Sequence, residues 1–85
     1  MEIIYSPKAQ IDILYWQKSG QNLIKQRISK IINDIEEHPE SGIGKPEKLK
    51  YELSGFWSRK INDKHGIIYK FNENTVYIYS LKGHY

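Results

Sequence analysis

The sequence predicts an α+β domain in which an N-terminal strand and a two-helix hairpin pack on one face of a mainly antiparallel sheet. Three observations lead to this prediction: a short β-rich segment opens the chain, two segments with helical periodicity follow, and three segments rich in β-branched and aromatic residues close it. This order is typical of α+β folds. The 85 residues suffice for one domain, residues 1–85, with a small core.

The first strand is expected at residues 2–5. A helix then begins at Ser6-Pro7, because a hydroxyl can cap a helix and proline suits its first turn. Ser19-Gly20 ends it. Its apolar positions recur with helical spacing at Ile11, Leu14 and Tyr15, with Trp16 beside them.

A second helix is expected at residues 21–37, with Pro39 just beyond its end. Its apolar residues keep a period of about 3.6; they are Ile24, Ile28, Ile31, Ile32 and Ile35. We expect the two helices to form an antiparallel hairpin with one shared apolar side.

Residues 40–55 are expected to form a surface loop with a brief helical turn near residues 47–49, since glycine, proline and charge crowd this segment. Strands follow at residues 56–61, 67–71 and 75–81, separated by polar turns. Strand alternation places aromatic residues on both faces of the sheet, which suggests that helices cover one face and leave the other, with tyrosines and cations, partly open. Such a face suits either nucleic-acid binding or an oligomer interface.

Composition narrows the class of function. The absence of cysteine excludes disulfides, thiolate metal sites and a cysteine nucleophile. Without an apolar segment of membrane-span length or a signal-peptide pattern, we expect a cytoplasmic protein with no membrane partner. The net charge of +3 is a weak tilt toward polyanions. His38 and His65 are interpreted as structural, and no metal or other cofactor is expected.

Residues 44–50 and 53–61, together with the terminal His84-Tyr85, resemble the YoeB branch of the RelE/ParE toxin superfamily. Tyr15-Trp16-Gln17 resembles the helix signature of that family, and the likeness covers the whole chain. The resemblance implies a RelE-like fold and the toxin of a bacterial type II toxin–antitoxin pair. Its implied activity is cleavage of messenger RNA in the A site of the 70S ribosome. Its implied partners are a second copy of the chain, a YefM-type antitoxin and, only through the antitoxin complex, operator DNA.

The resemblance also assigns roles in metal-free RNA cleavage. Such cleavage needs a base for the ribose 2′-hydroxyl, an acid for the leaving 5′-oxygen and cations for the charged phosphorane. Glu47 matches the general base of the family, His84 the general acid, and Tyr85 the terminal tyrosine that positions substrate. The cations expected to contact phosphates are Lys50, Arg59, Lys60 and Lys82. Singly, each residue has a plainer interpretation as a solvated or ion-paired side chain, and only their joint occurrence favours a site.

The likeness breaks at Gly66, which stands where the family has a phosphate-clamping arginine. Three explanations compete. The substitution attenuates a toxic activity, or Lys60, Lys64 or Lys82 replaces the arginine, or the domain binds its partners without cutting. We favour the first. A binder of antitoxin, ribosome or operator remains the alternative, as does a gyrase-poisoning toxin of the ParE kind, against which the pairing of Glu47 with His84 argues.

Overall fold

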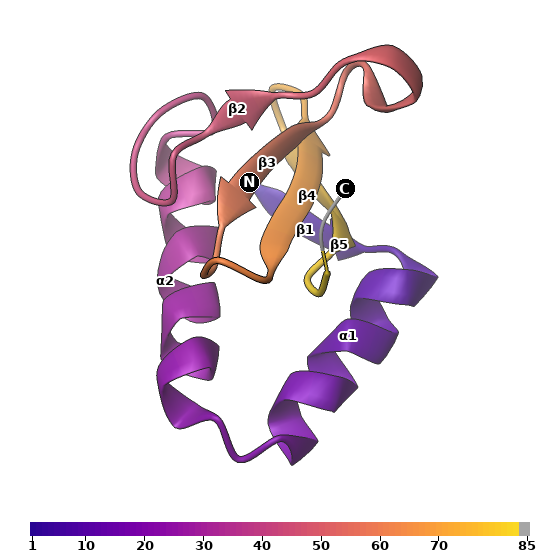
Figure 1. Ribbon diagram of the computed structural model, residues 1–85. Coiled ribbons are helices and arrows are strands. Elements are labelled where there is room, and N and C mark those ends of the chain that lie inside the picture. Colours follow the sequence, from indigo (N-terminus) through magenta and orange to yellow (C-terminus); the bar gives the residue numbers. More distant parts are fainter. Residues whose placement is uncertain (84–85) are drawn as a thin grey trace.

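The computed structural model describes residues 1–83, so His84 and Tyr85, which carry two of the predicted roles, lie outside the described residues. Two α-helices, a short 3-10 helix (η1) and a five-stranded sheet make up the fold (Figure 1). In chain order the elements are β1 (Glu2–Tyr5), α1 (Pro7–Lys18), α2 (Asn22–Glu37), β2 (Glu47–Lys48), η1 (Tyr51–Leu53), β3 (Trp57–Lys60), β4 (Gly66–Phe71) and β5 (Thr75–Ser80).

The sheet has the strand order β1-β5-β4-β3-β2. β1 runs parallel to β5, and all other neighbours are antiparallel, so the predicted α+β class with a mainly antiparallel sheet is confirmed. The pairing skips Tyr79, because Tyr69 lies opposite Ile78 and Ile68 opposite Ser80. This β-bulge turns the end of β5, from which the C-terminal residues continue.

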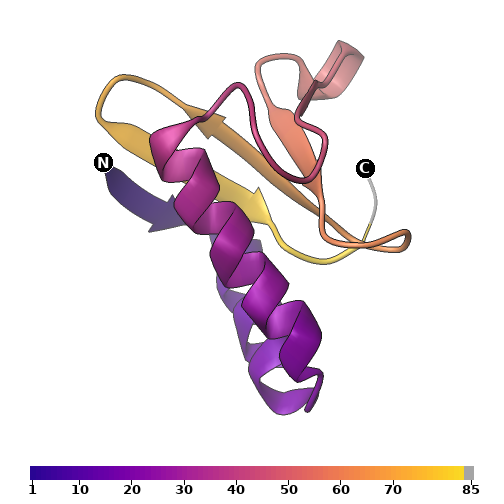
Figure 2. The ribbon, with the colours of Figure 1, turned by 90° about the vertical axis from the view of Figure 1, so that its left-hand side faces the viewer.

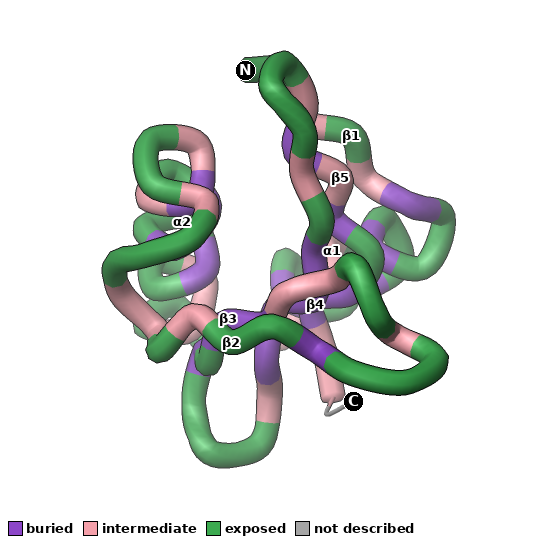
Figure 3. Tube along the Cα trace, turned by 90° about the horizontal axis from the view of Figure 1, so that it is seen from above, coloured by how far each residue is buried: buried purple, intermediate pink, exposed green. Residues whose placement is uncertain are grey.

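The core lies between the helices and one face of the sheet, with α2 crossing in front of the strands (Figure 2). From α2 the predicted isoleucine stripe supplies Ile28, Ile31, Ile32 and Ile35, all buried. On the other side of the core, the sheet contributes alternate residues of β4 and β5. They are Ile67, Tyr69, Val76 and Ile78, each with no exposed surface. Burial therefore follows β3, β4 and β5, whereas β2 is exposed (Figure 3).

The predicted apolar face of α1 is wrong. Ile11, Leu14 and Tyr15 are 66%, 54% and 45% exposed, and the buried side of the helix carries Asp12 and Trp16. Asp12 tolerates burial because its carboxylate accepts hydrogen bonds from the Leu81 backbone N–H (2.9 Å) and the Lys8 ammonium (2.8 Å). The helix is thus oriented by polar contacts to the segment after β5 and not by its apolar period.

The predicted helical turn at residues 47–49 is also wrong. Glu47 and Lys48 form β2, an edge strand that pairs with Ser58 and Trp57, and the helical turn comes later, as η1. Both side chains are exposed, and charged residues are typical of an edge strand because they discourage pairing with another chain.

Arg59 is the largest fully buried side chain. Its Nε donates to the Tyr69 hydroxyl at 3.1 Å, and its Nη1 donates to the Asp34 carboxylate at 2.5 Å. Three backbone carbonyls accept its remaining hydrogen bonds, those of His38, Ser41 and Ile43. One guanidinium therefore joins α2, the loop after it and the sheet.

Replacing Arg59 with Met should lower the free energy of unfolding by about 3 kcal/mol or more, because the change leaves Asp34 and three loop carbonyls without their buried donor. Urea denaturation measures this. Lys60→Met is the matched control, since Lys60 is exposed one position along β3, and it should stay within about 0.5 kcal/mol of the unmutated chain. Equal effects of the two substitutions would contradict the role given to Arg59.

The hydrogen bond from Arg59 holds the pKa of the Asp34 carboxyl below its ordinary value of 3.8. The charged form is favoured in the folded protein, so its contribution to stability is complete above that value and is lost as the pH falls through the lowered folded pKa. Asp34→Asn should therefore destabilise the protein at neutral pH, and the gap from the unmutated chain should narrow in acid below 3.8. Urea titrations at several pH values test this, and a gap independent of pH would refute it.

Candidate active site

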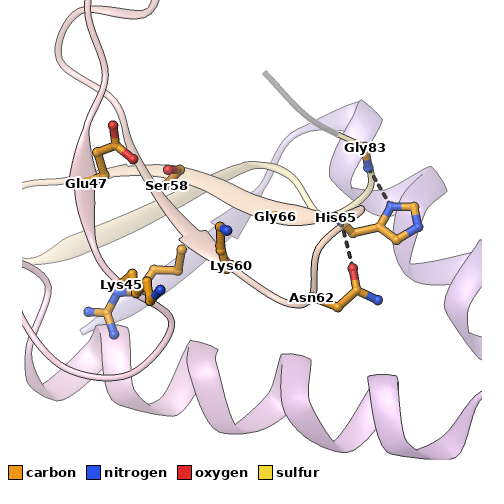
Figure 4. A pocket seen from close by; sticks show the side chains of 9 residues that line it. Lys45, Glu47, Ser58, Lys60, Asn62, His65, Gly66 and Gly83 are labelled. Carbon is orange, nitrogen blue, oxygen red and sulfur yellow. Dashed lines mark hydrogen bonds between the residues drawn. The ribbon is translucent and has the colours of Figure 1, made fainter.

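A hollow of about 380 Å³ opens where β2, β3, the β3–β4 turn and the segment after β5 meet (Figure 4). Its volume falls within the range of small-molecule sites, about 300–1,000 Å³. Glu47 lies toward one end and His65 with Gly83 toward the other, with Gly66 between them (Figure 4). The remaining lining residues are Lys45, Ser58, Arg59, Lys60 and Asn62.

Glu47 is positioned by the register of β2 on β3. It lies opposite Ser58, and cross-strand partners in an antiparallel pair point to the same face of the sheet. By the alternation of β3, Ser58 and Lys60 share this face, and Arg59 points the other way into the core. The carboxylate is exposed, so strand pairing and not burial directs it toward the hollow.

Lys45 reaches the hollow because the preceding loop approaches β3 closely. The backbone N–H of Lys60 donates to the Gly44 carbonyl at 2.6 Å, and a Cβ on Gly44 would come within 3.0 Å of the Lys60 carbonyl oxygen. Gly44 also has a φ of +82°, a conformation that favours glycine. The glycine thus sets the path of the chain into Lys45 and on to Glu47.

The C-terminal side of the hollow is fixed at Gly83, the residue before His84. Its N–H donates to Nδ1 of His65 at 2.9 Å, and its carbonyl accepts from the Gly66 N–H at 3.1 Å. Two residues earlier, the Leu81 carbonyl accepts from the Trp16 indole at 2.9 Å. Gly83, the last described residue, is therefore held at the rim of the hollow that Glu47 lines.

The predicted cations separate into two groups. Lys60 lines the hollow, whereas Lys50 borders a neighbouring depression that Glu47 shares. Lys82 points away to α1, with its ammonium 4.1 Å from the centroid of the Tyr15 ring. Lys64 lies in a third depression, beside Tyr15 and Asp63. Of the three lysines considered as substitutes for the missing arginine, only Lys60 lines this hollow.

The prediction that Arg59 contacts phosphates is corrected. Its side chain has no exposed surface, and all five donors of a guanidinium are used in the hydrogen bonds to Tyr69, Asp34 and the loop carbonyls. The residue borders the hollow, but its charge belongs to the core. His38 contributes its carbonyl to this arrangement at the end of α2, in keeping with the structural interpretation.

Gly66 is the first residue of β4, not a turn residue, and its φ is not left-handed. A Cβ added there would meet one atom closely, the Arg59 carbonyl oxygen at 3.2 Å. Gly66 lies opposite Lys60, so a side chain at this position would share the face that lines the hollow. Backbone conformation therefore does not require glycine here.

No group of three or more His, Asp or Glu side chains within residues 1–83 is arranged to hold a metal ion. Within the same residues, no helix is long and apolar enough to cross a membrane. The chemistry available in the hollow is that of a carboxylate, a hydroxyl, an imidazole and two ammonium groups.

The family model described as the YoeB-like toxin of the bacterial type II toxin–antitoxin system matches residues 5–85. The chain belongs to this family. Toxin YoeB of Escherichia coli O6:H1 is similar to it, with 40% identity over 85 residues that cover all of both chains. The RelE-like fold expected from the sequence is confirmed by solved structures of the same family.

Two such structures come from Staphylococcus aureus and are 37% identical to this YoeB-family chain, covering 100% of it and 98% of their own chains. One is a heterotetrameric complex of the YoeB–YefM toxin–antitoxin, with a TM-score of 0.88. The other is a YoeB dimer, with a TM-score of 0.90.

Sequence reasoning missed Lys45, Ser58 and Asn62 as lining residues, and it treated His65 as structural only. A signal for Asn62 was present, because asparagine at the start of a turn can bind its own backbone. Its Oδ1 accepts from the N–H groups of Lys64 (2.9 Å) and His65 (2.8 Å). This Asx turn directs His65 toward Gly83.

Proposed function

We propose that this toxin is a ribosome-dependent endoribonuclease that cleaves messenger RNA without a metal ion, with a rate weakened by Gly66. The observation that supports this most is that Glu47 and Gly83, the neighbour of His84, line one hollow. Nuclease chemistry of the proposed kind needs a base and an acid on either side of a single phosphodiester.

In the proposed reaction Glu47 takes the proton of the ribose 2′-hydroxyl, and the 2′-oxygen attacks the adjacent phosphorus. The bond from phosphorus to the 5′-oxygen breaks, and the imidazolium of His84 gives that oxygen its proton. The products are a 2′,3′-cyclic phosphate and a 5′-hydroxyl. Lys45 and Lys60 carry positive charge at the hollow and stabilise the doubly charged phosphorane. Tyr85 holds the substrate by stacking or hydrogen bonding.

The proposed partners follow from the family. A YefM-type antitoxin would block this chain, as a YefM accompanies YoeB in the heterotetramer, and two copies would form a homodimer like the relative's dimer. The proposed site of action is the A site of the ribosome in the cytoplasm. Operator DNA would be bound only through the antitoxin complex.

Primer extension on translated message tests the activity. Glu47→Gln and His84→Gln should each abolish cleavage, because each removes one proton-transfer group, typically worth about a hundred- to ten-thousand-fold in rate. Glu52→Gln and His38→Gln are matched controls at exposed positions away from the hollow and should cleave normally. Tight antitoxin binding with no cleavage by the unmutated chain would support the alternative, a non-catalytic binder, and inhibition of gyrase would support the ParE-like alternative.

Gly66→Arg should raise the cleavage rate by about a hundred- to a thousand-fold, the usual effect of one positioned charge stabiliser. An added Cβ has one close neighbour, the Arg59 carbonyl oxygen at 3.2 Å, so either side chain requires a local shift of a few tenths of an ångström, which the control variant shares. Gly66→Met is the matched control, because it adds a similar apolar stem without the charge. Single-turnover cleavage of ribosome-bound message gives the comparison, and an arginine variant no faster than the methionine variant would refute the clamp role.

A further inference from the structure

We propose that His65 is a positioning residue that fixes Gly83 at the rim of the hollow and so sets where the proposed general acid begins. The inference rests on the proposed function, because it gives His65 a role in placing His84. Nothing in the proposed proton transfers uses His65 itself, yet its imidazole lines the hollow.

Both backbone polar groups of Gly83 are held by two consecutive residues. Nδ1 of His65 accepts from the Gly83 N–H at 2.9 Å, and the Gly66 N–H donates to the Gly83 carbonyl at 3.1 Å. β5 ends at Ser80, so Gly83 lies three residues beyond the sheet ladder. These two hydrogen bonds hold the backbone of Gly83 in place, as strand pairing holds the backbone of β5.

The imidazole is itself held in place. Trp16 packs edge-on against it, with ring centroids 5.0 Å apart and planes at 88°. The His65 backbone N–H donates to Asn62 Oδ1 at 2.8 Å, and its carbonyl accepts from the Ile61 N–H at 2.9 Å. A ring restrained by both its backbone and a neighbouring indole loses little freedom when it binds Gly83.

The contact also fixes the chemistry of His65. A ring nitrogen that accepts a backbone N–H presents its lone pair to that group, so Nδ1 acts as an acceptor in this contact. Such a group is unsuited to donate a proton from Nδ1, in keeping with a positioning role. Misplacing a catalytic group by about 1 Å can cost about a hundredfold in rate, so a clamp one residue before His84 affects the chemical step.

Two substitutions of His65 distinguish the effect of losing the ring from the effect of losing the Nδ1 acceptor. His65→Phe keeps a flat ring against Trp16 but removes Nδ1, and it should slow single-turnover cleavage by about ten- to a hundredfold with the half-saturating message concentration unchanged. His65→Asn loses the ring but offers an amide oxygen near the place of Nδ1, and it should recover most of the rate. His38→Phe, at an exposed histidine outside the hollow, is the control and should change nothing.

Amide hydrogen exchange of Gly83 supplies a readout that does not depend on cleavage. Exchange at Gly83 should be faster in His65→Phe and close to normal in His65→Asn, with the Tyr69 and Ile78 amides unchanged in both. Unaltered Gly83 exchange in His65→Phe, or faster exchange with unaltered cleavage, would overturn the proposal. An unmutated chain with a protected Gly83 amide and no cleavage would instead refute the proposed function, and with it the catalytic part of this inference.

Discussion

The geometry of this toxin depends on a buried cation that has no place in the proposed chemistry. An isolated charge in a protein interior is strongly unfavourable, so the Arg59 guanidinium requires the carboxylate of Asp34, the Tyr69 hydroxyl and three loop carbonyls around it. Those carbonyls belong to the loop that leaves α2 and leads to Lys45 and Glu47. The same ion pair requires glycine at position 42, since a Cβ on Gly42 would lie 1.9 Å from the Asp34 carboxylate. Arg59 and its partners therefore order the part of the chain that leads to the hollow.

The elements best predicted from the sequence are those in which apolar period and burial agree. The isoleucines of α2 and the alternating residues of β4 and β5 bury the faces that their spacing predicts. The failures at α1 and at Arg59 share one cause, which is that buried polar groups are hydrogen-bonded to distant backbone. Asp12 turns α1 toward Leu81, and Arg59 is drawn into the core by carbonyls 16 to 21 positions away in the chain. Local periodicity contains no information on such partners.

The hollow is lined by three separated parts of the chain, residues 45–47, 58–66 and 83. Along β3, the alternation of side chains between the two faces of the sheet determines which of them reach the hollow. Ser58 and Lys60 face the hollow because Arg59, between them, faces the core, and a shift of one residue in the pairing of β3 would exchange these positions. The sequence contains this alternation, since a period of two places Arg59 on the same face as Trp57 and Ile61. What it lacked was the knowledge that the helices cover that face.

The backbone geometry at Gly66 and the charges at the hollow together indicate what the missing side chain at this position changes. Its backbone conformation suits any residue, so the absent side chain is not required by a turn, and the one close approach is that of the Arg59 carbonyl oxygen, 3.2 Å from an added Cβ. On the proposed function, the phosphorane gains negative charge beside Glu47. Among residues 1–83, Lys45 and Lys60 are the lining cations that are exposed, since the guanidinium of Arg59 is used in the core. An ammonium is a point charge, whereas a guanidinium binds two phosphate oxygens at once. On that proposal, lysines alone give weaker stabilisation of the charge than a guanidinium would. Under the proposed function, the chain therefore keeps Glu47 and Lys60 at the hollow and lacks one of the strongest electrostatic contributions to the reaction.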